Sequence, residues 1–88
     1  MYRIVEYMGN YQVESQLWWH ETLKSKSCAK FVAEALYKLN CHHSEDYYVI
    51  VEKINPNDPG LGDPVVVYAQ GDVLTGHDME QFLYEIEK

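Results

Sequence analysis

The side chains best suited to metal chemistry lie in one triplet, Cys41-His42-His43; the more remote candidate ligands are Cys28, His20 and His77. Structural zinc sites use thiolates and imidazoles in pairs spaced as C-x2-C or H-x3-H, and neither spacing occurs in this chain. Three adjacent side chains also cannot easily all point at one tetrahedral ion. We therefore expect no metal, and interpret the triplet as a polar connection between a helix and a strand.

The acidic segment from Asn55 to Asp63 is a second candidate, because its Asn and Asp oxygens are ligands that calcium prefers. An EF-hand loop beginning at Asn55 would place Pro59 at its fifth position and Val66 at its twelfth, where an oxygen ligand and a bidentate Glu are required. The pattern therefore predicts no calcium site.

Catalytic motifs are also missing from the sequence. The chain has no phosphate-binding glycine loop, no G-x-S-x-G elbow and no H-E-x-x-H helix. These observations favour a protein that is not an enzyme and needs no cofactor. A small hydrolase built from dispersed residues such as His42, His43 and Glu45 remains an alternative, since catalytic groups must be close in space and not in sequence.

Length and composition indicate one folded domain, residues 1–88. Apolar residues make up 47% of the chain and aromatic residues 14%, well above the composition of disordered sequences. No run of about 18 apolar residues and no basic-then-apolar leader is present, so we expect neither a membrane span nor a signal peptide. Two cysteines do not make a disulfide framework, which is typical of a cytoplasmic protein.

The charge is distributed unevenly along the chain. Residues 1–44 carry four acids and five bases, a net charge of +1, whereas residues 45–88 carry ten acids and two bases, a net charge of −8. Such an acidic half repels nucleic acid and anionic lipid. It therefore favours a protein partner with a basic surface, although a purely solubilising acidic surface is the alternative.

The first half predicts a β-hairpin followed by a helix. The hairpin is predicted over Tyr2 to Leu17, because Gly9-Asn10 is a two-residue turn signal. This turn pairs Met8 with Tyr11. A helix is predicted over 27–40, where apolar residues recur at helical spacing and indicate the buried face: Cys28, Phe31, Val32, Ala35, Leu36 and Leu39. A buried thiol in that face would be inert.

The second half repeats this order. Tyr47 to Ile54 and Val65 to Ala69 are apolar on both faces, which suits interior strands, and the segment 55–64 between them is predicted to be a loop from its three prolines. A second helix begins near Thr75 and presents an apolar stripe, Met79, Phe82, Leu83 and Ile86. The pseudo-repeat halves 1–44 and 45–88 predict an α+β fold, a ββαββα two-layer sandwich whose four-stranded, mainly antiparallel sheet has both helices on one face.

The predicted partner-binding surface combines carboxylates with two aromatic anchors. Acids steer a basic partner toward the surface, and exposed aromatic side chains supply selective contacts. The predicted set is Trp19, Glu45, Asp46, Asp58, Asp63, Asp72, Asp78, Glu80, Tyr84, Glu85 and Glu87.

Small size, an N-terminal hairpin and acids concentrated in one half make this chain resemble the small phage-encoded inhibitors, which include anti-CRISPR proteins and DNA mimics. The resemblance is one of class and rests on all nine acids just named. It implies stoichiometric blocking of a host defence nuclease or another nucleic-acid-binding protein. The basic first half departs from mimicry over the whole surface.

A self-associating structural or regulatory module is the principal alternative function. An N-terminal hairpin can leave one strand at a sheet edge, where outward Tyr7 and Val5 would support pairing of two copies. The oligomeric state expected from the sequence is therefore a monomer or a homodimer.

Overall fold

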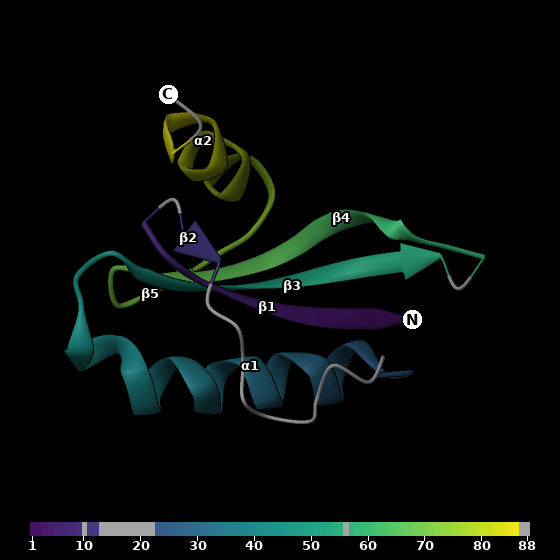
Figure 1. Cartoon of the computed structure of the whole chain (residues 1–88), viewed down its shortest axis with the longest axis horizontal. Coiled ribbons are helices and arrows are strands. Elements are labelled where there is room, and N and C mark those ends of the chain that lie inside the picture. The colour runs from purple at the N-terminus through teal and green to yellow at the C-terminus, as the bar shows by residue number, and fades with distance from the viewer. Residues whose placement is uncertain (10, 13–22, 56, 87–88) are drawn as a thin grey trace.

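An antiparallel sheet forms the centre of the structure and carries one helix on each face (Figure 1). The computed structural model describes residues 1–9, 11–12, 23–55 and 57–86. Within these ranges the sheet has five strands in the order β2 (Tyr11–Gln12), β1 (Tyr2–Met8), β3 (Tyr47–Asn55), β4 (Asp58–Ala69) and β5 (Asp72–Leu74). The predicted α+β class with an antiparallel sheet is confirmed, and β5 is an additional short strand.

The N-terminal hairpin has the predicted register. Met8 is paired with Tyr11 and Tyr7 with Gln12, and Gly9 in the turn has φ of +58°, a backbone conformation that glycine adopts at little cost. The expected continuation of the second strand to Leu17 lies outside the described residues. β1 pairs on its other side with β3, so it is an interior strand.

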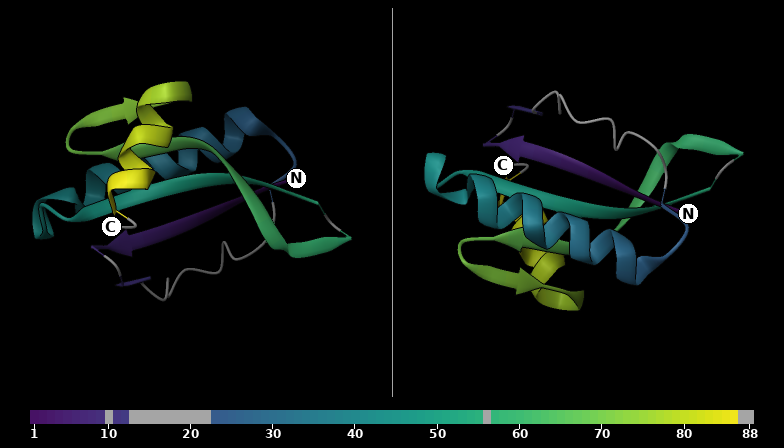
Figure 2. Two further views of the ribbon diagram at one scale, coloured as in Figure 1. Left: turned by 90° about the horizontal axis from the view of Figure 1, so that it is seen from above. Right: turned by 90° about the horizontal axis from the view of Figure 1, so that it is seen from below.

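The prediction that both helices lie on one face of the sheet is wrong. Tyr47, Val49 and Val51 of β3 pack on the side of α1 (Lys26–Asn40), whereas Tyr48 and Ile50 pack on the side of α2 (Gly76–Ile86). Figure 2 shows the two helices on opposite sides of the strands. Because the interior strands are apolar on both faces, each face needs its own cover, and the result is three layers instead of two.

The buried face of α1 also differs from the prediction. Ser25 caps the helix by accepting a 3.3 Å hydrogen bond from Cys28 N, but the residues that face the sheet are Ala29, Ala33 and Leu36. The predicted stripe is largely solvent-exposed: Phe31 is 74% exposed, Leu39 is 67% exposed, and Cys28 and Ala35 are exposed.

Tyrosines of the sheet explain this rotation of α1. The ring of Tyr37 on the helix lies 6.0 Å from that of Tyr47 and 6.4 Å from that of Tyr68, and the Tyr68 hydroxyl donates a 3.1 Å hydrogen bond to Lys30 O. Large side chains on the strands need small partners on the helix, and fully buried Ala29 and Ala33 provide them.

The segment 55–64 is not the predicted loop. β3 extends to Asn55 and β4 begins at Asp58, so most of this segment continues the two strands as a ribbon, with register shifts at Val51/Glu52 and Ile54/Asn55. Irregular pairing of this kind accommodates prolines that a regular ladder would exclude.

The C-terminal helix agrees with the prediction. α2 begins at Gly76, directly after Thr75, and its apolar stripe packs on the sheet through buried Met79 and half-buried Phe82, Leu83 and Ile86. In the described part of the chain, neither helix has the length and apolar character needed to cross a membrane.

Candidate binding pocket and acidic surface

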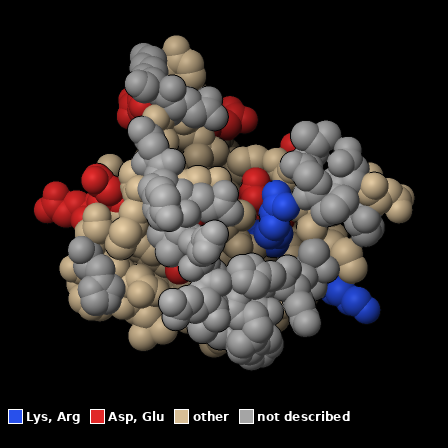
Figure 3. Space-filling view, in the orientation of Figure 1, with Lys and Arg blue, Asp and Glu red and all other residues tan. Residues whose placement is uncertain are grey.

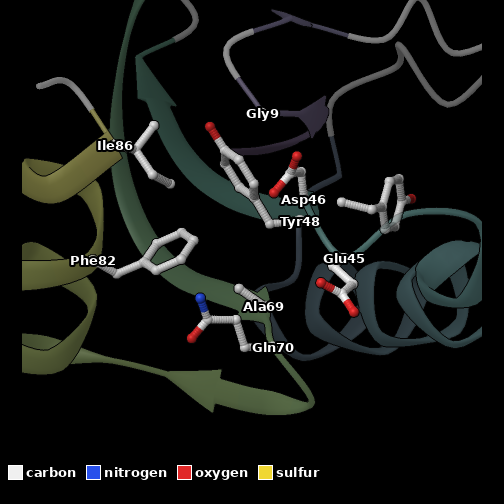
Figure 4. A pocket seen from close by; sticks show the side chains of 9 residues that line it. Gly9, Glu45, Asp46, Tyr48, Ala69, Gln70, Phe82 and Ile86 are labelled. Carbon is white, nitrogen blue, oxygen red and sulfur yellow. The ribbon is translucent and has the colours of Figure 1, made fainter.

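A pocket of about 110 Å³ opens at one end of the sheet, between α2 and the turn that precedes β3. Figure 4 shows Phe82 and Ile86 reaching it from α2 on one side, and the carboxyl groups of Glu45 and Asp46 on the other. The remaining lining residues come from the strand ends and their turns: Gly9, Tyr47, Tyr48, Ala69 and Gln70.

Backbone hydrogen bonds hold the acidic side of the pocket in place. Asp46 N donates to Ser44 Oγ at 3.1 Å, and Asp46 O accepts from Gly9 N at 3.0 Å. The first bond closes the turn before β3, and the second ties that turn to the turn of the N-terminal hairpin. The two exposed carboxylates are therefore carried by a turn that is anchored on both sides.

Aromatic rings form the inner wall of the pocket. Tyr48 stacks on Tyr7 with a centroid distance of 5.1 Å, and it contacts Phe82 edge-to-face at 5.3 Å. Burial, with a smaller contribution from Tyr7, raises the pKa of Tyr48 above its ordinary value, so its hydroxyl is neutral at physiological pH. A group that enters the pocket thus meets neutral aromatic surface inside and negative charge at the rim.

Six of the predicted site residues belong to what we call the acidic surface: Glu45, Asp46, Asp72, Asp78, Glu80 and Glu85. The first three lie at one end of the sheet, where Ala69 pairs with both Tyr48 and Asp72, and the other three lie on α2. All six are solvent-exposed. The predicted anchor Tyr84 stands on the same helix and is 59% exposed.

Two predicted acids are separated from this surface. Asp58 pairs with Asn55 and Asp63 with Lys53, at the opposite end of β3 from Tyr47. Trp19 and Glu87 lie outside the described residues. The structure therefore gathers part of the predicted set and places Asp58 and Asp63 elsewhere.

The described lysines lie on the α1 layer or at the far end of the sheet, and Arg3 of β1 pairs with Glu52 of β3. Lys26, Lys30 and Lys38 belong to α1, exposed Lys24 precedes it, and Lys53 lies at the end of β3 remote from the pocket. Among the described residues, α2 and β5 carry no lysine or arginine. Figure 3 shows acidic side chains at one end and around α2, and basic side chains both near the middle of this face, beside an acidic one, and toward the opposite end. The acidic surface and the described lysines therefore occupy different parts of the folded chain.

The pocket itself has no signature in the sequence. Tyr48 belongs to β3, Phe82 and Ile86 belong to α2, and Gln70 lies in the turn after β4, so their convergence depends on α2 crossing the second face of the sheet. The sequence signal that pointed toward the acidic side of this site was the pair of acids Glu45 and Asp46, which stands directly before an interior strand. Tyr7 and Val5, which were expected to support strand pairing between copies, are in fact packed: Tyr7 against Tyr48, and Val5 at 8% exposure.

The candidate metal ligands do not form a cluster in the described part of the chain, where no group of three or more His, Cys, Asp and Glu is placed to hold an ion. Cys28 is on the exposed side of α1, while Cys41 and exposed His42 lie in the short 3-10 turn η1 (Cys41–His43).

In comparisons of sequence and structure, no family model, no curated protein and no solved structure matches this chain.

Proposed function

We propose that this protein is a non-enzymatic inhibitor that binds a nucleic-acid-binding protein through the acidic surface and so competes with nucleic acid for a basic groove. The observation that carries the proposal is the separation of the acidic surface from the lysines: six exposed acids gather on α2 and the adjacent end of the sheet, while the exposed lysines of the described ranges lie on α1, directly before it or at the far end of β3. A surface of one sign raises the association rate with an oppositely charged partner.

Charge alone would attract many basic proteins, so selectivity requires contacts that exclude water. Tyr84 supplies one such contact, because its 59% exposed ring stands among the acids of α2. The resemblance to phage-encoded inhibitors agrees with this mode of action and makes a defence nuclease a plausible class of target.

The test is capture of partners from the native cell or its host, followed by titration of the purified partner under rising salt. Affinity should fall steeply as salt shortens the Debye length from about 10 Å at 0.1 M to about 3 Å at 1 M. Nucleic acid that binds the partner should compete with the protein for it.

Two variants with the same change in net charge sharpen this test. Glu80→Lys with Glu85→Lys alters the acidic surface and should abolish binding, whereas Glu34→Lys with Asp63→Lys alters acids of α1 and of the far sheet end and should leave binding nearly unchanged. All four positions are exposed or half-exposed, so both variants should fold. Equal loss in the two variants would show that only total charge matters and would contradict the proposal.

Self-association is a second candidate function, and the exposed stripe of α1 favours it. Phe31 and Leu39 lie beside Lys30 and Lys38, and a second copy offers complementary chemistry in α2, with Tyr84 among acids. Contact between α1 of one copy and α2 of the next would be heterologous and would build rings or filaments. Light scattering should then show a mass that rises with concentration and falls with Phe31→Ser; a concentration-independent monomer would exclude this candidate.

A further inference from the structure

We infer that the pocket between α2 and the turn before β3 receives one arginine side chain of the basic partner. The inference rests on the proposed function, because it assigns a particular contact to the same acidic surface. It adds a binding site with a defined ligand chemistry, a planar cation.

The size of the pocket fits a single side chain. Its volume is about 110 Å³. An apolar cavity of about 150 Å³ holds one benzene-sized molecule, and pockets for drug-sized ligands begin at about 300 Å³. A whole cofactor or nucleotide is therefore too large, whereas the end of one long side chain is of the right size.

The lining selects a cation that also has flat apolar faces. Phe82 and Tyr48 line the pocket with aromatic rings, and Figure 4 shows Glu45 and Asp46 across the pocket from Phe82, with the Tyr48 ring beside Asp46. All the lining residues are described, and none of them is basic. Aromatic faces attract cations, and carboxylates pair with them, so the two sides favour the same charge.

An arginine side chain can contact the aromatic rings and the carboxylates of the pocket at the same time. Its guanidinium group stacks flat on an aromatic ring while its N–H groups donate to carboxylates in the ring plane, whereas an ammonium group is a compact, strongly hydrated charge. The aliphatic stem of arginine would lie along Ala69 and Ile86, which are apolar lining residues. The hydrogen bonds of Asp46 with Ser44 and Gly9 hold its backbone, so the position from which this carboxylate extends is set before the ligand arrives.

The experiment is an NMR titration of the full isotope-labelled chain with the amides of N-acetyl-arginine, N-acetyl-citrulline and N-acetyl-lysine. Citrulline has nearly the shape of arginine without its charge. The arginine compound should give saturable shifts at Asp46, Tyr48, Gln70 and Phe82, and the citrulline compound should not. Equal shifts with citrulline, tighter binding of lysine, or no shift at these residues would each overturn the inference.

Matched variants locate the site. Asp46→Asn removes one rim charge and should weaken arginine binding about twofold to fivefold, the range of an exposed ion pair. Asp63→Asn makes the same change at the far end of the sheet and should have no effect. Phe82→Leu keeps an apolar wall without a π-face and should weaken binding by a similar factor. Should Phe82→Leu disturb folding, as its spectrum would show, Glu45→Gln tests the rim at an exposed position.

The experiments can contradict the arginine pocket and the proposed inhibitor function independently of each other. If arginine binds the pocket but the Glu80→Lys, Glu85→Lys variant still captures the partner, the pocket inference stands and the acidic-surface inhibitor proposal is wrong. If that variant loses the partner but arginine amide gives no shifts, the inhibitor proposal stands and the arginine pocket is overturned.

Discussion

The Tyr47 hydroxyl donates a 2.6 Å hydrogen bond to Glu6 Oε1 beneath α1, where Tyr47 is 3% exposed and Glu6 is 7% exposed. The bond joins β1 to β3 and satisfies a carboxylate that lies on the same face of β1 as Tyr2 and Ile4. A buried carboxylate without such a donor is costly. Tyr47 therefore allows a charged residue to occupy the core.

Replacing Tyr47 with Phe should lower the free energy of unfolding by about 1–3 kcal/mol, because Glu6 loses the donor of this hydrogen bond while remaining buried. Urea denaturation monitored by circular dichroism measures the change.

The double variant Glu6→Met with Tyr47→Phe provides the control. Removing both polar partners and keeping their approximate volume should leave the protein more stable than Tyr47→Phe alone. A double variant whose destabilisation equals the sum of the two single changes would mean that the hydrogen bond contributes no coupling.

Stability should fall at alkaline pH because of three buried tyrosines. Burial raises the pKa of Tyr47, Tyr48 and Tyr68, and for Tyr47 the hydrogen bond to Glu6 adds to this effect. A raised pKa in the folded state means that the stabilisation is complete below the unfolded value of about 10 and is lost as pH rises above it.

Above that pH, each tyrosine that stays protonated only in the folded state should reduce the free energy of unfolding by about 1.4 kcal/mol per pH unit. Denaturant titrations at several pH values, together with the ultraviolet absorbance of tyrosinate, measure this slope. Noncooperative ionisation of all eight tyrosines near pH 10 in the folded protein would contradict the prediction.

The orientation of α1 can be tested with two substitutions on opposite sides of the helix. Ala33→Leu inserts volume at a fully buried position and should destabilise the protein by about 1–3 kcal/mol, whereas Phe31→Ser, at 74% exposure, should change stability by about 0.5 kcal/mol or less. Thermal unfolding followed by circular dichroism compares them. The reverse order of effects would restore the buried face predicted from the sequence.

Gly62 lies against the half-buried ion pair between Arg3 and Glu52, whose Nη2 and Oε1 are 3.1 Å apart. A Cβ at position 62 would come within 2.8 Å of Glu52 Oε2 and 2.9 Å of Arg3 Nη2. Gly62→Ala should therefore displace the ion pair and cost roughly 0.5–1 kcal/mol, since the contacted atoms are the ends of flexible side chains.

High salt provides the control for Gly62→Ala. If the destabilisation comes from the displaced ion pair, the difference from the parent protein should shrink as salt weakens that pair. A cost that stays constant with salt would assign the effect to packing instead.

Local pattern alone determined several elements of this protein. The hairpin register at Met8 and Tyr11, the interior strands β3 and β4, and the apolar stripe of α2 follow from turn chemistry and from periodicities of two and 3.6 residues, which are properties of neighbouring residues. The acidic character of α2 and of Glu45-Asp46 likewise follows from composition.

Only the tertiary structure decided which surfaces meet. The sequence offers α1 two helical stripes, and the smaller residues were buried because tyrosines from β3 and β4 already fill the space beneath the helix. The path of α2 over the opposite face created the pocket at Phe82 and Ile86 and left Asp58 and Asp63 at the other end of the sheet. Volume complementarity between distant segments has no signature in local periodicity, because it depends on which side chains face one another after the strands have paired.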